Sequence, residues 1–124
     1  MVFQLKRFSW DGSKNSKSIK YDERLDLERF RSEKTTSSAV YELSAVVAHA
    51  GSTNYGHYIC YAKDRDGQWM KFNDSQTSHS SAKDVLAPPG GFTPYLLFYQ
   101  REEEEVEDDV VGEEEEAEEA EEEE

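Results

Sequence analysis

Charge is divided sharply along this chain, and the division limits how much of it can fold. The last 23 of the 124 residues, 102–124, contain 17 of the 28 Asp and Glu and no Lys or Arg. Such a segment repels itself and has too little apolar surface to offset the entropy lost on ordering. We therefore predict a folded part over residues 1–101 and a disordered, acidic low-complexity tail over residues 102–124.

The acidic tail has three interpretations. The first is a solvated, solubilising segment, which is the usual meaning of a run of like charges. The second is an arm that binds basic partners such as histones. A helix is the third, because Glu and Ala favour helices, but repulsion between Glu residues four apart opposes it. The net charge of −14 belongs to the tail, since fourteen Lys and Arg outnumber eleven acids in residues 1–101 and leave them at +3.

The single cysteine, Cys60, limits the compartment and the cofactors. One cysteine allows neither an intrachain disulfide nor a multi-cysteine zinc site, so we expect no metal and no other cofactor. The pattern indicates a reducing compartment, the cytoplasm or the nucleus. We expect no membrane segment, because no apolar run approaches about 20 residues, and no secretory signal. We expect no nucleic-acid binding, because the basic residues form no clustered stripe.

The folded part reads as four to five mostly antiparallel strands with little helix. The runs with strand propensity are 2–8, 41–48, 57–63, 68–73 and 95–100. The Asp66–Gly67 pair predicts a turn that joins 57–63 and 68–73 into a hairpin. Residues 50–56 and 87–94 are predicted loops, and 21–30 is either a helical turn or extended. Because no segment supplies a helical layer to cover the sheet, we expect these strands to be part of a larger fold.

Two polar side chains of the predicted hairpin stand out. A three-residue loop sets Ile59 opposite Asn73, which makes His57 and Asn73 diagonal neighbours on one face, roughly 7–8 Å apart at the backbone. With a register shifted by two residues they would face each other directly, and an odd register would put them on opposite faces. A His oriented by an Asn is half of a Cys–His–Asn hydrolase site, in which the second ring nitrogen activates a thiol. Cys60 is not that thiol, because an offset of three points it away from His57.

The order of motifs resembles the histidine box of the ubiquitin-specific proteases. The matching stretches are Tyr41–Gly51, Gly56–Tyr61, Trp69–Asp74 and Tyr95–Tyr99, with Leu5–Phe8 similar to a Leu-Lys-Arg-Phe strand of the family. The resemblance covers residues 2–101. It implies a mainly β part of an α+β papain-like cysteine peptidase fold, namely the C-terminal part of the antiparallel palm sheet.

The resemblance also implies roles for individual residues. His57 would be the general base and later the general acid, Asn73 the third triad member, and Asp74 an adjacent assisting acid. The loop 50–56 is similar to the loop that lies over the C-terminal tail of ubiquitin. It implies substrate-binding roles for Gly51, Tyr55, Gly56 and Tyr58. His49 is interpreted as structural or loop-supporting.

The implied reaction is hydrolysis of the bond after the last glycine of ubiquitin, through a thioester. The family's nucleophilic cysteine lies upstream of Leu5–Phe8, and this chain does not contain it. We therefore expect ubiquitin or ubiquitinated proteins as partners, and activity only together with the upstream half of the catalytic domain. The alternative is a non-catalytic ubiquitin-binding or protein-interaction module from a truncated or degenerate paralogue. The set His57, Asn73 and Asp74 favours the enzyme, and the missing nucleophile favours the module.

Overall fold

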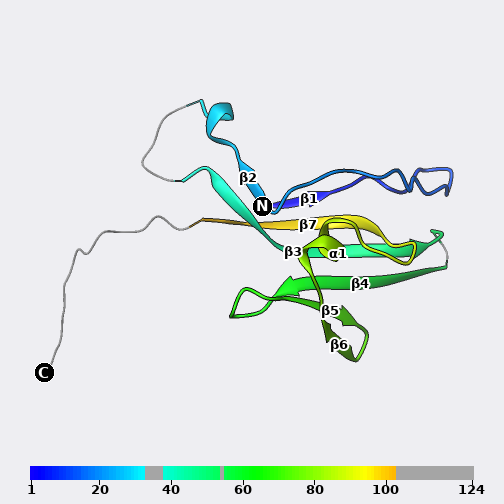
Figure 1. Cartoon of the computed structure of the whole chain (residues 1–124). Helices are drawn as coiled ribbons and strands as arrows, with labels where there is room; N and C mark the ends of the chain where they lie inside the picture. Colours follow the sequence, from blue (N-terminus) through cyan, green and yellow to red (C-terminus); the bar gives the residue numbers. More distant parts are fainter. Residues whose placement is uncertain (33–37, 54, 103–124) are drawn as a thin grey trace, which may run out of the picture.

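The computed structural model describes residues 1–32, 38–53 and 55–102. The described residues form seven strands in one antiparallel sheet, with the order β1-β7-β3-β4-β5-β6 and with β2 paired to β3 (Figure 1). The strands are β1 (Val2–Gln4), β2 (Arg24–Asp26), β3 (Val40–Gly51), β4 (Gly56–Lys63), β5 (Trp69–Asn73), β6 (Gln76–His79) and β7 (Thr93–Arg101). The prediction of a disordered tail falls on residues outside these ranges, apart from Glu102.

Two short helical segments accompany the sheet within the described ranges. They are the 3₁₀ turn η1 (Glu28–Phe30) and the helix α1 (Ala82–Leu86). Ser81 caps α1, because its side chain accepts a hydrogen bond from the Asp84 amide. This satisfies one of the free amides at the start of a helix. No helix in these ranges is long and apolar enough to cross a membrane.

The core lies on the face of the sheet that α1 covers. Strand alternation and cross-strand pairing bring large apolar side chains together on this face, since Val46 pairs with Tyr61 and with Leu97. Val85 of α1 is completely buried against them. The other members of the buried cluster are Leu43, Ala48, Ile59, Trp69 and Tyr99. A single turn of helix is not stable alone, so burial of Val85 holds α1 in place.

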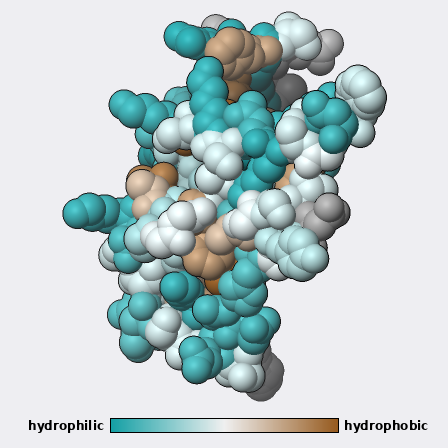
Figure 2. Space-filling model, turned by 90° about the vertical axis from the view of Figure 1, so that its right-hand side faces the viewer, coloured by the Kyte–Doolittle hydropathy of each residue, from teal (hydrophilic) through white to brown (hydrophobic). Residues whose placement is uncertain are grey.

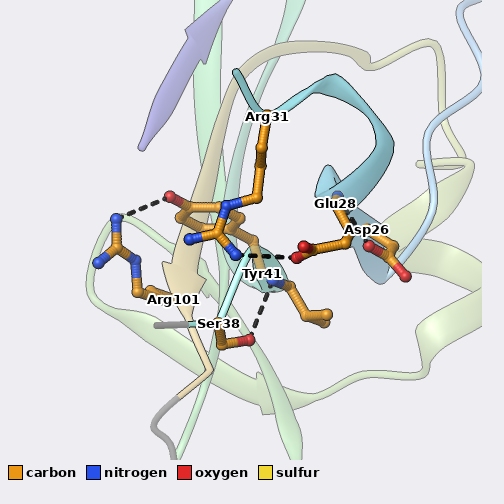
Figure 3. A network of polar contacts seen from close by, with 7 residues as sticks. Asp26, Glu28, Arg31, Ser38, Tyr41 and Arg101 are labelled. Atoms are coloured by element: carbon orange, nitrogen blue, oxygen red, sulfur yellow. Dashed lines mark hydrogen bonds and ion pairs between the residues drawn. The ribbon is translucent and has the colours of Figure 1, made fainter. Parts of the chain in front are cut away.

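A group of polar contacts lies near the start of β3 (Figure 3). Arg31 forms an ion pair with Glu28 at 2.9 Å, and the Glu28 amide donates to Asp26. Arg101 Nη2 donates to the Tyr41 hydroxyl at 3.3 Å. These contacts lie beside the start of β3, whereas the residues discussed below lie at its end, so the network is remote from the candidate site.

Several predictions of local structure need correction. The loop expected over 50–56 is shorter, because β3 continues to Gly51 and β4 begins at Gly56. The strand expected over 2–8 is shorter and spans Val2–Gln4. Residues 21–30 contain both of the alternatives, a short strand and a 3₁₀ turn. The helix α1 and the strand β6 were not expected, and α1 supplies a small piece of the helical cover that seemed absent.

Candidate active site

The β4–β5 hairpin brings His57 and Asn73 into contact. Lys63 pairs with Trp69 and Cys60 with Phe72, which is the register of a hairpin that turns at Asp66–Gly67. The next position in this register is Ile59 opposite Asn73, so His57 and Asn73 are diagonal neighbours on one face. Their side chains are joined by a hydrogen bond of 2.6 Å between His57 Nε2 and Asn73 Oδ1. The predicted contact is therefore present.

The identity of the bonded atoms defines the tautomer of His57. An amide oxygen can only accept a hydrogen bond, so Nε2 must carry the hydrogen and donate it. In the neutral ring the other nitrogen, Nδ1, then holds a free lone pair. His57 is exposed, and the ring of Phe92 packs edge-on at 6.1 Å. The pair thus presents a proton acceptor, Nδ1, on a ring whose orientation is held by Asn73.

Asp74 follows Asn73 in the turn between β5 and β6. Asn73 pairs with Gln76, so Asp74 and Ser75 form a two-residue connection. Asp74 has a φ of 54°, a left-handed conformation that Asn and Asp adopt more readily than other non-glycine residues. Its side chain is exposed. The turn thus fixes the end of the strand that carries Asn73, and the assisting role of Asp74 stays a prediction.

The predicted substrate-binding residues surround the β3–β4 turn, apart from Tyr58. Gly51 pairs with Gly56, and Gly51 has a φ of 99° with a Cβ position only 2.1 Å from the Tyr55 carbonyl oxygen. Any side chain at Gly51 would therefore displace the turn. Tyr55 is 86% exposed at the tip. Tyr58 points to the opposite face from His57, where its ring lies 4.6 Å from that of His49.

Sequence reasoning did not predict that a second loop meets this turn. Thr53 Oγ1 donates to the Gly12 carbonyl at 2.8 Å, and Gly12 lies in a turn closed by the bridge between Phe8 and Lys14. The Asp11–Gly12 pair is the same turn signal that located the β4–β5 hairpin, so it predicts the turn at Gly12 but not the contact of that turn with Thr53. Figure 2 shows this end of the molecule, where small apolar patches are scattered among polar side chains.

Cys60 differs from a catalytic thiol in position and in environment. It lies on the face opposite His57, and its Sγ donates to the Tyr61 carbonyl at 3.6 Å. Burial raises the pKa of the Cys60 thiol. A raised pKa lowers the fraction of thiolate, the reactive form. Within the described ranges, no group of three or more His, Cys, Asp or Glu is placed to hold a metal ion.

The fold and the His57–Asn73 pair are those of one half of a cysteine hydrolase active site. An imidazole oriented by an amide oxygen, with its second nitrogen free, has the arrangement of the base-bearing half of a Cys–His–Asn hydrolase site. The model of the family "Ubiquitin carboxyl-terminal hydrolase" matches residues 1–99. The chain therefore belongs to the ubiquitin carboxyl-terminal hydrolase family.

Individual relatives agree with the family assignment. Ubiquitin carboxyl-terminal hydrolase 17-like protein 6 of Homo sapiens is 40% identical over 100 residues, which are 79% of this chain and 24% of that protein. The 17-like protein 22 of Homo sapiens is also 40% identical, over 18% of its length. The chain thus spans about a quarter or less of the length of these relatives.

Solved structures show the same fold. One is the SAGA Ubp8/Sgf11/Sus1/Sgf73 DUB module, with a TM-score of 0.68 and 39% identity over 82% of this chain and 23% of that chain. Another is the same module bound to ubiquitin aldehyde, with a TM-score of 0.67 and 36% identity over 82% of this chain and 24% of that chain. The antiparallel sheet is therefore a part of the papain-like domain of this family.

Proposed function

We propose that this chain is the C-terminal, histidine-bearing part of a cysteine-type deubiquitinase, whose nucleophilic thiol comes from polypeptide outside these 124 residues. The observation that carries the proposal is the 2.6 Å bond between His57 Nε2 and Asn73 Oδ1 in a chain of this family. The proposed substrates and partners are ubiquitin and ubiquitinated proteins, and the proposed location is the cytoplasm or the nucleus.

The geometry of the pair supports the following proton path. His57 Nδ1 takes the proton of the thiol, and the thiolate attacks the carbonyl carbon of the last glycine of ubiquitin. His57 then returns that proton to the leaving amine as the bond to the amine breaks, which leaves a thioester. Water attacks the thioester with His57 again as base, releasing the ubiquitin carboxylate and the thiol. Asn73 holds the ring through Nε2 in every step, so Nδ1 stays directed at the reacting atoms.

A chimeric enzyme tests this assignment. Residues 1–101 replace the matching segment of a relative such as the 17-like protein 6, and turnover of a C-terminal ubiquitin fluorogenic substrate is measured. We expect an active chimera and a loss of about 10²–10⁴-fold in kcat on His57→Ala, the usual contribution of a general base. The matched control is Cys60→Ser, which should leave turnover unchanged.

The same experiment separates the second candidate function, a non-catalytic ubiquitin-binding module. The observation that favours it is that the only cysteine, Cys60, faces away from His57. An inactive chimera that still binds ubiquitin would support the module and contradict the enzyme. Turnover by the 124-residue chain alone, abolished by Cys60→Ser, would contradict both.

A further inference from the structure

A second histidine, His49, lies on the strand next to the one that carries the candidate base. It is on β3, opposite Tyr58, whereas its neighbour Ala50 is opposite His57. His49 therefore projects to the reverse face of the sheet. Its side chain is only 2% exposed, and its ring packs against the rings of Phe8 at 5.3 Å and Tyr58 at 4.6 Å. A buried ring thus supports the strand pair that carries His57.

The His49 ring occupies the space that a side chain at Gly56 would fill. A Cβ added to Gly56 would lie 1.8 Å from His49 Nε2, 2.7 Å from Cε1 and 2.8 Å from Cδ2. Because Nε2 is the nearest ring atom and its two neighbouring carbons are farther away by nearly equal amounts, the imidazole points its Nε2 corner at Gly56. Gly56 immediately precedes His57, so the ring contacts the backbone from which the candidate base projects.

The backbone of Gly56 does not itself require glycine. The glycines with positive φ among the described residues are Gly12, Gly51, Gly67, Gly90 and Gly91. Gly56 is not among them, so its conformation is one that any residue can adopt. The His49 ring is therefore what excludes a side chain at this position.

The His49 backbone is also held firmly. Its carbonyl accepts hydrogen bonds from Lys14 Nζ at 3.2 Å and from Thr93 Oγ1 at 3.1 Å. The Nδ1 atom of the ring is buried and has no hydrogen-bond partner in the part of the chain that is described. Burial, together with the charge of Lys14, lowers the pKa of His49, which favours the neutral form of the ring. The ring thus acts through its shape and its packing.

We propose that His49 is a positioning residue, which forms a steric pair with Gly56 and so holds His57 against Asn73. The proposal rests on the proposed role of His57 as the base. The ring presses on the Cα of Gly56 from the back of the sheet, and this contact limits how far the start of β4 can tilt. Without it, the His57 ring can leave the Asn73 oxygen, and Nε2 loses the bond that selects its tautomer.

Nuclear magnetic resonance of the histidine ring nitrogens tests the pair in the full 124-residue chain. The measured quantity is the ratio of the two neutral tautomers of His57, at a temperature well below unfolding. We expect the form with hydrogen on Nε2 to dominate in the natural sequence. His49→Ala should lower the ratio about fivefold, the change that corresponds to one ordinary hydrogen bond. A role confined to stability would lower the melting temperature and leave this ratio unchanged.

A double-variant cycle provides the decisive comparison. Gly56→Ala places a methyl group against the His49 ring and should also lower the ratio. In the double variant His49→Ala/Gly56→Ala the methyl group enters the space left by the His49 ring. The tautomer ratio of His57 should therefore recover most of its value in the natural sequence. If Gly56→Ala prevents folding, restoration of folding by His49→Ala supports the pair. The steric pair is overturned if the double variant lowers the tautomer ratio by as much as the two single variants combined. It is also overturned if the double variant is still unfolded.

Two controls complete the measurement. His79→Ala removes the exposed histidine of β6 and should leave the His57 signals unchanged. Asn73→Ala gives the ratio that corresponds to complete loss of the contact. The readout does not depend on turnover, so an inactive chimera would contradict the proposed enzyme and would leave the steric pair intact. An unchanged His57 ratio in a folded His49→Ala chain would contradict the pair alone.

Discussion

Removal of two methyl groups from Val85 tests whether the short helix α1 packs against the core of the sheet in solution. Val85 is 0% exposed and belongs to the core cluster that contains Trp69. Val85→Ala lowers the hydrophobic contribution to the free energy of unfolding by about 0.8 kcal/mol for each buried carbon, roughly 1.6 kcal/mol in all. The cavity left behind adds to this loss, and the better helix propensity of Ala subtracts up to about 0.5 kcal/mol. We therefore expect a loss of about 2 kcal/mol in the free energy of unfolding.

The assay is urea unfolding followed by the fluorescence of Trp69. Trp10 is 99% exposed, so Trp10→Phe removes a second signal at little cost in stability. With a dependence of about 1–3 kcal/mol per molar urea, the midpoint should fall by about 1 M. The matched control is Val2→Ala on β1, where the valine is 56% exposed and the change should stay within about 0.5 kcal/mol. Equal shifts for the two variants would refute the reasoning that α1 packs on the sheet.

Four further results are expected. Asn73→Ala should abolish the tautomer preference of His57. In the chimera the same variant should lower kcat and change KM much less. Burial raises the pKa of Tyr21 from 10.0, so the stability that its neutral phenol contributes is complete below pH 10 and is lost at higher pH. Urea midpoints should therefore fall above pH 10, and less steeply in Tyr21→Phe, which also loses the bond to the Val85 carbonyl. The pKa of His49 is lowered from 6.5, so urea midpoints should fall as the pH drops below 6.5, because the unfolded chain binds the proton first. Ser81→Ala should cost about 1 kcal/mol through loss of the α1 cap, measured by the same midpoints.

The contact at the site could be predicted because a short turn determines a register. Asp66–Gly67 located the hairpin, and its loop length placed Ile59 opposite Asn73, which the pairing of Cys60 with Phe72 bears out. Alternation then set His57 and Asn73 on one face. Only local chemistry was needed for this step, since turn residues and a two-residue period act within a few residues of each other.

The parts that sequence reasoning missed depend on the partners that they pair or pack with, and not on their own residue pattern. Strand β6 is exposed along its whole length and has no apolar alternation, so only its pairing with β5 defines it. Helix α1 is too short to show a helical period, and its stability comes from Val85 packing on residues far away in the sequence. The end of β3 was assigned to a loop because residues 50–56 contain two glycines and no apolar run, yet pairing with β4 extends the strand to Gly51.

The two histidines of the β3–β4 hairpin show why a motif alone does not assign roles. His49 and His57 lie on paired strands and differ in face, because His57 is opposite Ala50 and not opposite His49. His57 is exposed with an oriented ring and a free nitrogen, which suits proton transfer. His49 is buried with a lowered pKa, so it is a poor proton acceptor at neutral pH. Its role must therefore be exerted through packing, and the space over Gly56 is where that packing reaches the backbone of His57.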